Sequence, residues 1–235
     1  MSDEGEHVRA RLGTALAPAW RRVTEGENRL AVSLAILVAI GLQLAVPDRL
    51  TLSRTWVLPA IEALLLVVLV VAGPWRVAQR SQLGRLGGLV LVAVASLANG
   101  WSAGALVRGL IAGTAGDRAT PLLVTGGAIW LTNILIFALW FWELDRGGPA
   151  PRAAGARADG ADFLFPQMAT PGSASPDWEP EFVDYLYVAF TNATAFSPTD
   201  TMPLTQRAKL LMLAQSLISL IMAALVIARA VNVLK

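Results

Sequence analysis

The sequence predicts an all-α, polytopic transmembrane helical bundle, and three observations lead to this fold class. Hydrophobic residues make up 55% of the 235 residues and charged residues only 15%, whereas a soluble domain carries about 25% charged residues. The apolar residues fall in long runs, close to the roughly 20 residues that cross a bilayer as a helix. Tryptophans lie near the ends of these runs, as expected at membrane interfaces.

Five runs are predicted as clear spans. They cover residues 30–46, 57–73, 86–113, 120–142 and 210–234. Pro47 and Pro74 follow the first two runs, and proline cannot continue a helix without losing a backbone hydrogen bond. The third run is rich in small residues, which favours close contact between helices.

A sixth element, residues 179–197, is ambiguous. From Pro180 it offers about 18 residues, or ~27 Å of helix at 1.5 Å per residue, which barely crosses a hydrocarbon core of about 30 Å. It is either a sixth short crossing or a re-entrant helix that resembles a pore helix. The arginine distribution over the whole chain favours the crossing.

The chain divides into four parts by composition. Residues 1–29 form a polar cytoplasmic tail, 30–144 a four-helix transmembrane region, 145–178 a flexible linker, and 179–235 a final helix pair. The linker is rich in Ala, Gly, Pro and Asp, and such a composition does not build a core. One stretch is an exception, because Phe163-Leu164-Phe165-Pro166 is expected to pack back on the protein or to lie in the membrane interface.

The arginines predict the orientation. With six crossings, the N-terminal tail and the loops around 76–85 and 146–157 share one side and hold most of the arginines. The arginine-rich side of a membrane protein is cytoplasmic. The sequence therefore predicts a multi-pass protein of the cell membrane with both termini and the 145–178 linker in the cytoplasm. Glu143 and Arg229 are then on the same side.

The composition argues against catalytic, metal and nucleic-acid chemistry. The chain has no cysteine, and its one histidine, His7, lies in the polar tail, whereas a transition-metal site needs several such ligands. No histidine or paired carboxylates stand within the spans to act as acid and base. No basic patch is interleaved with aromatic residues. We expect no enzyme activity, cofactor, metal or nucleic acid; the expected partners are the lipid bilayer and further copies of the chain.

The most informative motif follows Tyr187-Val188-Ala189-Phe190-Thr191. It consists of Thr194, Ala195, Phe196, Ser197, Pro198, Thr199 and Asp200, and continues to Pro203. This stretch resembles the pore loop of bacterial two-helix potassium channels, which reads T-T-V-G-Y-G-D-x-x-P. The next helix, ending Val226-Ile227-Ala228-Arg229, resembles the inner helix of that family. The resemblance covers about fifty residues and implies a pore-loop-like helix pair over 179–235. The whole chain also resembles a group of actinobacterial integral membrane proteins, a likeness that supplies no mechanism.

The motif departs from the channel pattern at the filter. Ser197-Pro198-Thr199 stands where the channels have Gly-Tyr-Gly, Ala195 replaces the second threonine, and Ser219 replaces the hinge glycine. A potassium filter binds ions through backbone carbonyls, and its glycines allow backbone angles that other residues resist. The potassium filter is therefore lost. The alternative is that Ser197 to Asp200 form a capped turn into the last helix, with Asp200 as an N-terminal cap or a residue at a pore mouth.

Other polar residues lie within the predicted spans. Glu62 and Arg108 fall at about the same depth in consecutive antiparallel helices, and burying either charge alone is costly. They are predicted to form an intramembrane ion pair; the alternative is that the two side chains extend separately to the lipid headgroups. Polar side chains of the other spans are expected to join helices by hydrogen bonds worth on the order of 1 kcal/mol each, and these are Asn99, Asn133, Asn192 and Gln215.

Two functions remain from the sequence. The first is a structural or regulatory membrane protein without a catalytic site, whose channel-like C-terminal helix pair has lost its potassium filter. The second is a weakly selective, oligomeric ion channel or small-solute pathway. A channel is a symmetric oligomer whose pore loops meet on the axis, so the oligomeric state distinguishes the two.

Overall fold

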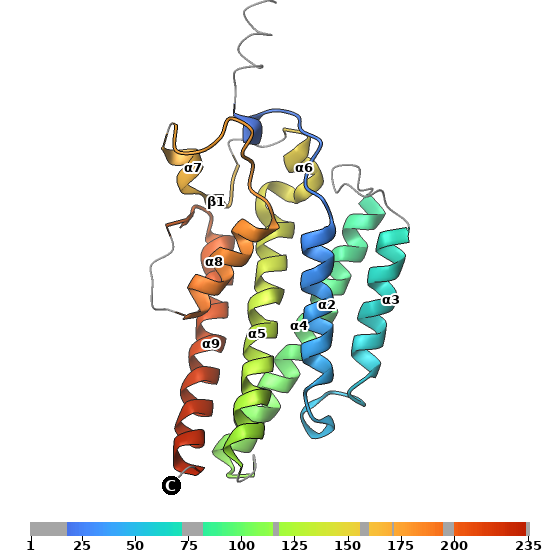
Figure 1. The fold of residues 1–235 in the computed structure, drawn as a ribbon, viewed down its shortest axis with the longest axis vertical. Helices are drawn as coiled ribbons and strands as arrows, with labels where there is room; N and C mark the ends of the chain where they lie inside the picture. The colour runs from blue at the N-terminus through green and yellow to red at the C-terminus, as the bar shows by residue number, and fades with distance from the viewer. Residues whose placement is uncertain are drawn as a thin grey trace, which may run out of the picture.

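The computed structural model describes residues 18–71, 82–114, 118–155, 160–170, 172–194 and 200–233, which form a helical bundle with a small folded cap at one end (Figure 1). The five apolar runs fold as helices close to their predicted bounds, which confirms the all-α class. The helices of the bundle are α2 Leu30–Leu44, α3 Val57–Val71, α4 Gln82–Ile111, α5 Ala119–Leu144, α8 Phe182–Thr194 and α9 Gln206–Val233.

Three helical segments are long and apolar enough to cross a membrane. They are Gly84–Ile111, Ala119–Gly147 and Gln206–Asn232. The prediction of five clear spans is therefore too high among the described residues. The difference lies in α2 and α3, which have 15 residues each and extend only about 22 Å at 1.5 Å per residue.

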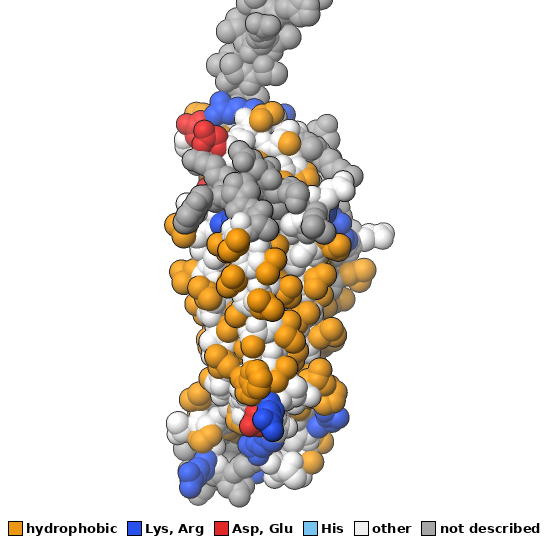
Figure 2. Space-filling view, turned by 90° about the vertical axis from the view of Figure 1, so that its right-hand side faces the viewer, with side chains coloured by type: hydrophobic (Ala, Val, Ile, Leu, Met, Phe, Trp, Pro, Cys, Tyr) orange, Lys and Arg blue, Asp and Glu red, His pale blue; other side chains and the backbone are white. Residues whose placement is uncertain are grey.

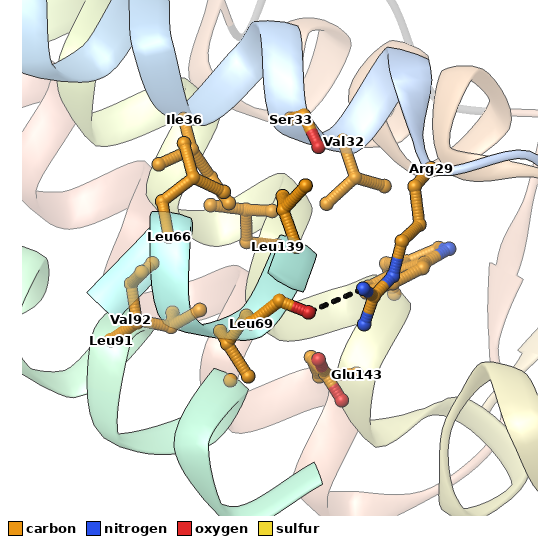
Figure 3. A pocket seen from close by; sticks show the side chains of 13 residues that line it. Arg29, Val32, Ser33, Ile36, Leu66, Leu69, Leu91, Val92, Leu139 and Glu143 are labelled. Carbon is orange, nitrogen blue, oxygen red and sulfur yellow. Dashed lines mark hydrogen bonds between the residues drawn. The ribbon is translucent and has the colours of Figure 1, made fainter. Parts of the chain in front are cut away.

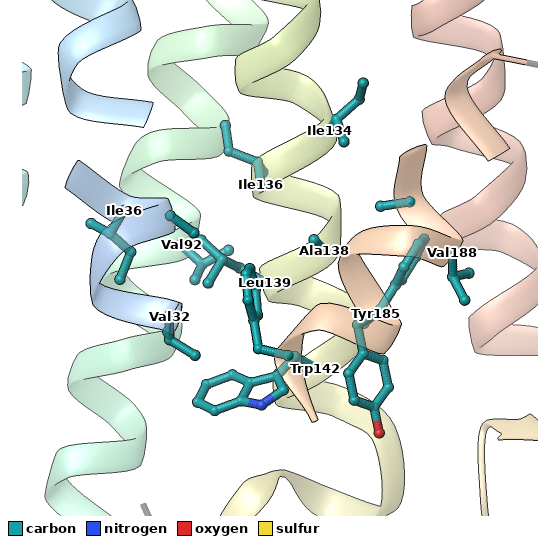
Figure 4. Packing of buried hydrophobic residues seen from close by; sticks show 14 of the residues in the cluster. Val32, Ile36, Val92, Ile134, Ile136, Ala138, Leu139, Trp142, Tyr185 and Val188 are labelled. Atoms are coloured by element: carbon teal, nitrogen blue, oxygen red, sulfur yellow. The ribbon is translucent and has the colours of Figure 1, made fainter. Parts of the chain in front are cut away.

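Helix α5 forms the centre of the bundle. It contacts α2 and α4 on one side and α8 and α9 on the other, as Figure 4 shows. Ile136, Ala138 and Leu139 of α5 are at most 2% exposed. They belong to one apolar cluster with side chains of the surrounding helices, among them Val32, Ile36, Val92, Tyr185 and Val188.

A second apolar cluster holds α5 against α9 and α4 nearer the other end, and includes Leu106, Ile129 and Met222. A glycine allows the close approach of α5 and α9 here. A Cβ atom at Gly126 would lie 2.7 Å from a methyl carbon of Val226, closer than two carbon atoms can approach without displacement.

The cap is built from short elements between α5 and α8. These are η4 Asp145–Gly147, α6 Pro149–Ala153, β1 Phe163–Leu164 and α7 Pro166–Ala169, together with η1 Ala19–Arg21 from the N-terminal side and β2 Met202–Pro203 from the C-terminal side. The sequence predicted a flexible linker over 145–178, whereas its described parts are folded. Phe163 and Phe165 are 1% and 2% exposed, which confirms that this apolar stretch packs back on the protein.

At the end opposite the cap, α2 and α3 are joined through η2 Asp48–Leu50. α8 does not reach this end, because it stops after 13 residues. The chain then returns to the cap, where Phe163 pairs with Pro203 and Leu164 with Met202 in an antiparallel ladder. This course of the chain is that of a re-entrant helix, and the predicted sixth crossing over 179–197 is not confirmed.

The two ends of the described chain lie at opposite ends of the bundle. The backbone N–H groups of Ala19 and Thr24 donate to carbonyls of Pro176 and Ala153 in the cap, whereas α9 finishes at the far end (Figure 1). The prediction that both termini share a side is therefore not confirmed by the described residues. Glu143 and Arg229 likewise lie near opposite ends, contrary to the prediction.

The exterior of the bundle is apolar around its middle. Figure 2 shows hydrophobic side chains in a broad band on one face, with lysine, arginine and acidic side chains toward the two ends. Large apolar residues are exposed on several helices, including Leu64, Leu97, Leu210 and Leu220 at 63%, 71%, 65% and 63%. This band matches the three long apolar helices and is the surface that a hydrocarbon layer would cover.

Candidate functional site

Helix α8 and the segment after it form a hairpin that begins and ends at the cap. α8 starts at Phe182 and runs beside α5 and α9. Asn192, in its last turn, meets Gln215 of α9, which lies about 14 Å along α9 from Gln206 at 1.5 Å per residue. The hairpin therefore reaches roughly a third of the way along α9, which is about 42 Å long by the same measure.

Polar side chains fix the inner end of α8 against α9. The Asn192 amide donates to the Met212 carbonyl at 2.9 Å and to Gln215 Oε1 at 2.8 Å. Gln215, fully buried, donates back to the Ala189 carbonyl at 2.8 Å. The hydroxyl of Ser216 donates to Asn192 Oδ1 at 3.0 Å. The Ser216 hydroxyl also donates to the Asn192 backbone carbonyl at 3.1 Å, one of the last carbonyls of α8, which have no partner inside the helix. These contacts stabilise a helix that stops within the bundle.

Helices α5 and α9 share a further buried contact at this depth. Asn133 Nδ2 donates to the hydroxyl of Ser219 at 3.2 Å, and both residues are buried. Ser219 occupies the position of the hinge glycine in the channel resemblance. The predicted interhelical hydrogen bonds are thus confirmed for Asn133, Asn192 and Gln215; Asn99 is buried in α4.

Two residues of the motif, Thr194 and Asp200, belong to the part of the chain that the structure describes. Thr194 ends α8, and its hydroxyl donates to the Thr191 carbonyl at 3.0 Å. Residues 195–199, which include Ala195, Phe196, Ser197, Pro198 and Thr199, lie outside the described residues. Asp200 is exposed and precedes β2.

Asp200 does not cap the last helix, contrary to one prediction for it. α9 begins only at Gln206. The hydroxyl of Thr205 accepts from the Ala208 N–H at 3.2 Å, which is the contact of an N-cap residue. The prediction placed the cap too early, because β2 occupies the residues between Asp200 and the helix.

The start of α9 is bound to the cap through Asp162. This buried carboxylate accepts from the Thr205 hydroxyl at 2.5 Å and forms an ion pair with Arg207. Its backbone carbonyl accepts from the Leu204 N–H at 2.8 Å, and Arg207 also donates to the Leu144 carbonyl at 3.1 Å. One acidic residue thus joins the end of α5, the cap and the start of α9.

A second set of contacts closes the cap over the end of α5. Asp145 is fully buried and accepts from the Tyr185 hydroxyl at 2.6 Å and from the Asp162 N–H at 2.7 Å. Arg152 donates to the carbonyls of Trp142 and Asp145 at 2.6 and 3.0 Å. Arg146 has a positive φ of 52°, which costs energy for a residue with a side chain. The composition of this segment gave no signal of such a network, because each partner is distant in sequence or is a backbone group.

Glu27 links the segment before α2 to both α5 and α8. Its carboxylate accepts from the Trp142 indole N–H and from the Phe182 backbone N–H, each at 2.8 Å. Phe182 is the first residue of α8, so Glu27 supplies an acceptor to an N–H that the helix leaves unpaired. Burial raises the pKa of Glu27 to about 7, although the two hydrogen bonds and Arg152 oppose the shift.

The predicted pair of Glu62 and Arg108 is not brought together. Glu62 is 1% exposed and accepts from Gln43 Nε2, which lies 3.2 and 2.9 Å from its two oxygens. Arg108 is exposed, and its guanidinium lies 5.5 Å from the ring centre of Trp101. No ion pair among the described residues joins them. Gln43 takes the place of the arginine because the short α2–α3 connection brings it to the depth of Glu62.

A narrow cleft near the cap is lined by α2, α3, α4 and α5 (Figure 3). Arg29 donates to the Leu69 carbonyl at 2.6 Å, and Glu143 faces the same cleft. The rest of the lining is mostly apolar, including Ile36, Leu66 and Leu91. The cleft therefore combines one cation, one carboxylate and the hydroxyl of Ser33 at the edge of an apolar wall.

Among the described residues, no group of three or more His, Cys, Asp and Glu side chains is placed to hold a metal ion. Comparisons with protein-family models, curated proteins and solved structures found no match to this chain.

Proposed function

We propose that this chain is an integral membrane protein in which α5, α8 and α9 form a pore-loop unit, and that it serves as one subunit of an oligomeric, weakly selective pathway for ions or small solutes. The observation that carries the proposal is the hairpin of α8. A helix that enters from one end, stops inside the bundle and returns to the same end before a full-length helix is the arrangement of a pore loop.

The physical argument concerns backbone polar groups. Within a bilayer, backbone that is neither helix nor closed sheet is tolerated only where protein buries it or where it lines a water-filled cavity. Asn192, in the last turn of α8, meets Gln215 of α9, and the neighbouring Leu213 and Leu217 of α9 are exposed and apolar. α8 therefore ends at a depth where the outside of the bundle is apolar. Contact between pore loops of neighbouring subunits around an axis would give residues 195–199 such a cavity.

The proposed pathway is not selective for potassium. Pro198 has a fixed φ and no N–H, and Ser197 and Thr199 stand in place of the two filter glycines. At these positions the sequence offers the hydroxyl groups of Ser197 and Thr199, followed by the carboxylate of Asp200, instead of the glycines that an unbroken column of carbonyls requires. The second candidate is a structural or regulatory protein with a closed loop, and the specific observation in its favour is the same proline.

We test the pathway with purified full-length protein. Its mass in mild detergent should correspond to a symmetric oligomer, and proteoliposomes should pass both K⁺ and Na⁺. The chain has no cysteine, so Ser197→Cys allows a thiol reagent to be directed at the loop. The reagent should block flux in Ser197→Cys and leave it unchanged in Ser173→Cys, a control at an exposed cap position. A monomer without flux would favour the structural or regulatory function.

We further propose that the cap faces the cytoplasm. The cap end carries more arginine and lysine than the other end among the described residues, and includes Arg21, Arg22, Arg146, Arg152 and Arg207. The rule that cytoplasmic segments are rich in these residues then places the far end of α9 outside. This orientation is opposite to the one that the channel resemblance implies.

Single cysteines test the hairpin and the orientation together. An impermeant thiol reagent applied to intact cells should label Ala112→Cys, at an exposed position of the far end, and should leave Ser173→Cys and Asp200→Cys unlabelled. Labelling of Ser173→Cys and Asp200→Cys but not of Ala112→Cys would mean that the cap faces outside, with the hairpin unchanged. If Asp200→Cys behaved like Ala112→Cys, residues 179–197 would cross the membrane and the pore-loop proposal would fail.

A further inference from the structure

Glu62 is a buried acid in an apolar helix, and no cationic side chain among the described residues forms an ion pair with it. It is 1% exposed and lies about 7 Å into α3 from Val57 at 1.5 Å per residue. Its hydrogen-bond partner is the neutral amide of Gln43. Transfer of an unpaired carboxylate into such surroundings is costly, and a group of this kind takes up a proton instead.

The surroundings of Glu62 argue against a metal ion or a basic side chain as its partner and leave a proton. No cluster of three acidic, histidine or cysteine ligands exists among the described residues, and Arg108 is exposed at Trp101. The buried polar side chains that α2 and α4 carry in this part of the bundle include Gln43, Asn99 and Ser102, and all three are uncharged. One carboxylate and one amide give too few oxygen ligands for a metal ion, which takes about six, but they are sufficient for a proton.

A small cavity lies between Gln43 and the loop at the end opposite the cap. Gln43 lines it together with Ser102 and the loop residues Thr51 to Thr55, and Arg54 is the charged residue of the lining. The cavity has room for a single water molecule, and several of its lining groups are polar enough to bind one. Gln43 thus lies between the cavity and Glu62, contacting both.

We propose that Glu62 is a proton-binding site in the membrane-embedded part of the chain, and that it exchanges its proton through Gln43 and this cavity with the solvent at the end opposite the cap. The site goes beyond the pore-loop proposal and is distant from it, since it is formed by α2 and α3. It is also a modification site for a hydrophobic carbodiimide. The acid O–H adds across one C=N bond to give an O-acylisourea, which rearranges to a stable N-acylurea, so no group leaves.

Infrared spectroscopy of the full-length protein in detergent tests the proton. At neutral pH the wild type should show the C=O stretching band of a protonated carboxyl group that is missing in Glu62→Gln, a variant of the same shape. Glu143→Gln, at the cap end, should keep this band. If Glu62→Gln removed no protonated band and instead removed a carboxylate band, Glu62 would be ionised and the proposal would be overturned.

Carbodiimide labelling tests the route. Dicyclohexylcarbodiimide should form an adduct on Glu62, identified by peptide mass mapping, and the adduct should be absent in Glu62→Gln. Gln43→Ala should accelerate the labelling of Glu62 by a water-soluble carbodiimide at least severalfold, because the amide no longer lies between the acid and the cavity. An unchanged rate in Gln43→Ala would overturn the route through Gln43. These outcomes do not depend on flux through the pore loop.

Discussion

The two sides of α5 are held together by different forces. Toward α2 and α4 the contacts are mostly between apolar side chains, and α2 and α3 share the polar contact of Gln43 with Glu62. Toward α8 and α9, buried amides and hydroxyls bind backbone carbonyls and one another. A helix that continues to the end of the bundle satisfies its own backbone, whereas one that stops inside needs polar partners. The polar side of α5 therefore marks where the chain departs from a simple bundle.

Glu27, which precedes α2, binds Trp142 of α5 and Phe182 of α8. Its titration should have the largest expected effect on the stability of the protein. Its pKa of about 7 in the folded protein exceeds the ordinary 4.5, so the folded state holds a proton that the unfolded state has lost between these pH values. Stability should then fall as pH rises from about 4.5 to about 7. At about 1.4 kcal/mol per pKa unit, the total is on the order of 3 kcal/mol.

Thermal unfolding in detergent between pH 4.5 and pH 8 measures this slope. Glu27→Gln has no proton to lose and should make the dependence clearly shallower, leaving the part that the proton of Glu62 contributes. Glu25→Gln, at a neighbouring exposed position, should keep the wild-type slope. A wild-type slope that survived in Glu27→Gln would assign the titration to another group.

Asp162 should carry the next largest effect, since it attaches the cap to the polar side. Asp162→Ala leaves the Thr205 hydroxyl and Arg207 without their acceptor. Hydrogen bonds to charged groups are worth about 1.5–3 kcal/mol, and Arg207 is half exposed, so we expect a loss of about 2 kcal/mol. Asp177→Ala removes the partner of Arg22 at an exposed site and should cost less than about 0.5 kcal/mol. Equal losses would mean that Asp162 does not anchor α9.

The sequence predicted the apolar side of the molecule better than the polar side. Runs of apolar residues located α2 to α5 and α9, because a helix held by apolar contacts consists largely of apolar residues and is visible in the sequence as such a run. The return of the chain after α8 is not visible in this way. It depends on Asp162 with Arg207 and on Phe163 with Pro203, pairs that are distant in sequence. The available signal was the polarity of α8 itself, since Thr191, Asn192 and Thr194 suit a helix that ends among polar partners.

Glu62 and Arg108 show a second limit of the sequence. Their depths were similar, but depth does not specify which face of a helix a residue occupies. Glu62 faces Gln43 inside the bundle, and Arg108 lies on the outside. Arg108 was predicted as the partner of Glu62 because it carries the opposite charge. Gln43 is neutral, so no charge argument selects it from the sequence.

Adjacent glycines of α5 provide a matched test of its contact with α9. A Cβ atom at Gly126 would lie 2.7–3.3 Å from the Val226 side chain, while one at Gly127 would meet nothing within 4 Å. Valine is β-branched and moves little, so Gly126→Ala should destabilise the protein by about 1–2 kcal/mol, within the range for overpacking. Gly127→Ala should be neutral or slightly stabilising, because alanine favours a helix. Similar unfolding temperatures for the two variants would contradict the close approach of α5 and α9.

The smallest expected effect is the coupling between Asn192 and Gln215, and it addresses the polar side most directly. Asn192→Leu and Gln215→Leu each remove an amide that binds the backbone of the other helix. The two amides also bind each other at 2.8 Å, so the double variant should lose less than the sum of the single losses. The difference should be about 1 kcal/mol, the usual size for interhelical polar contacts. Asn133→Leu with Gln215→Leu serves as a control, because Asn133 binds Ser219 instead and its loss should be nearly additive. If the first pair were additive as well, α8 would be held by its apolar face, and the contrast between the two sides of α5 would have no energetic basis.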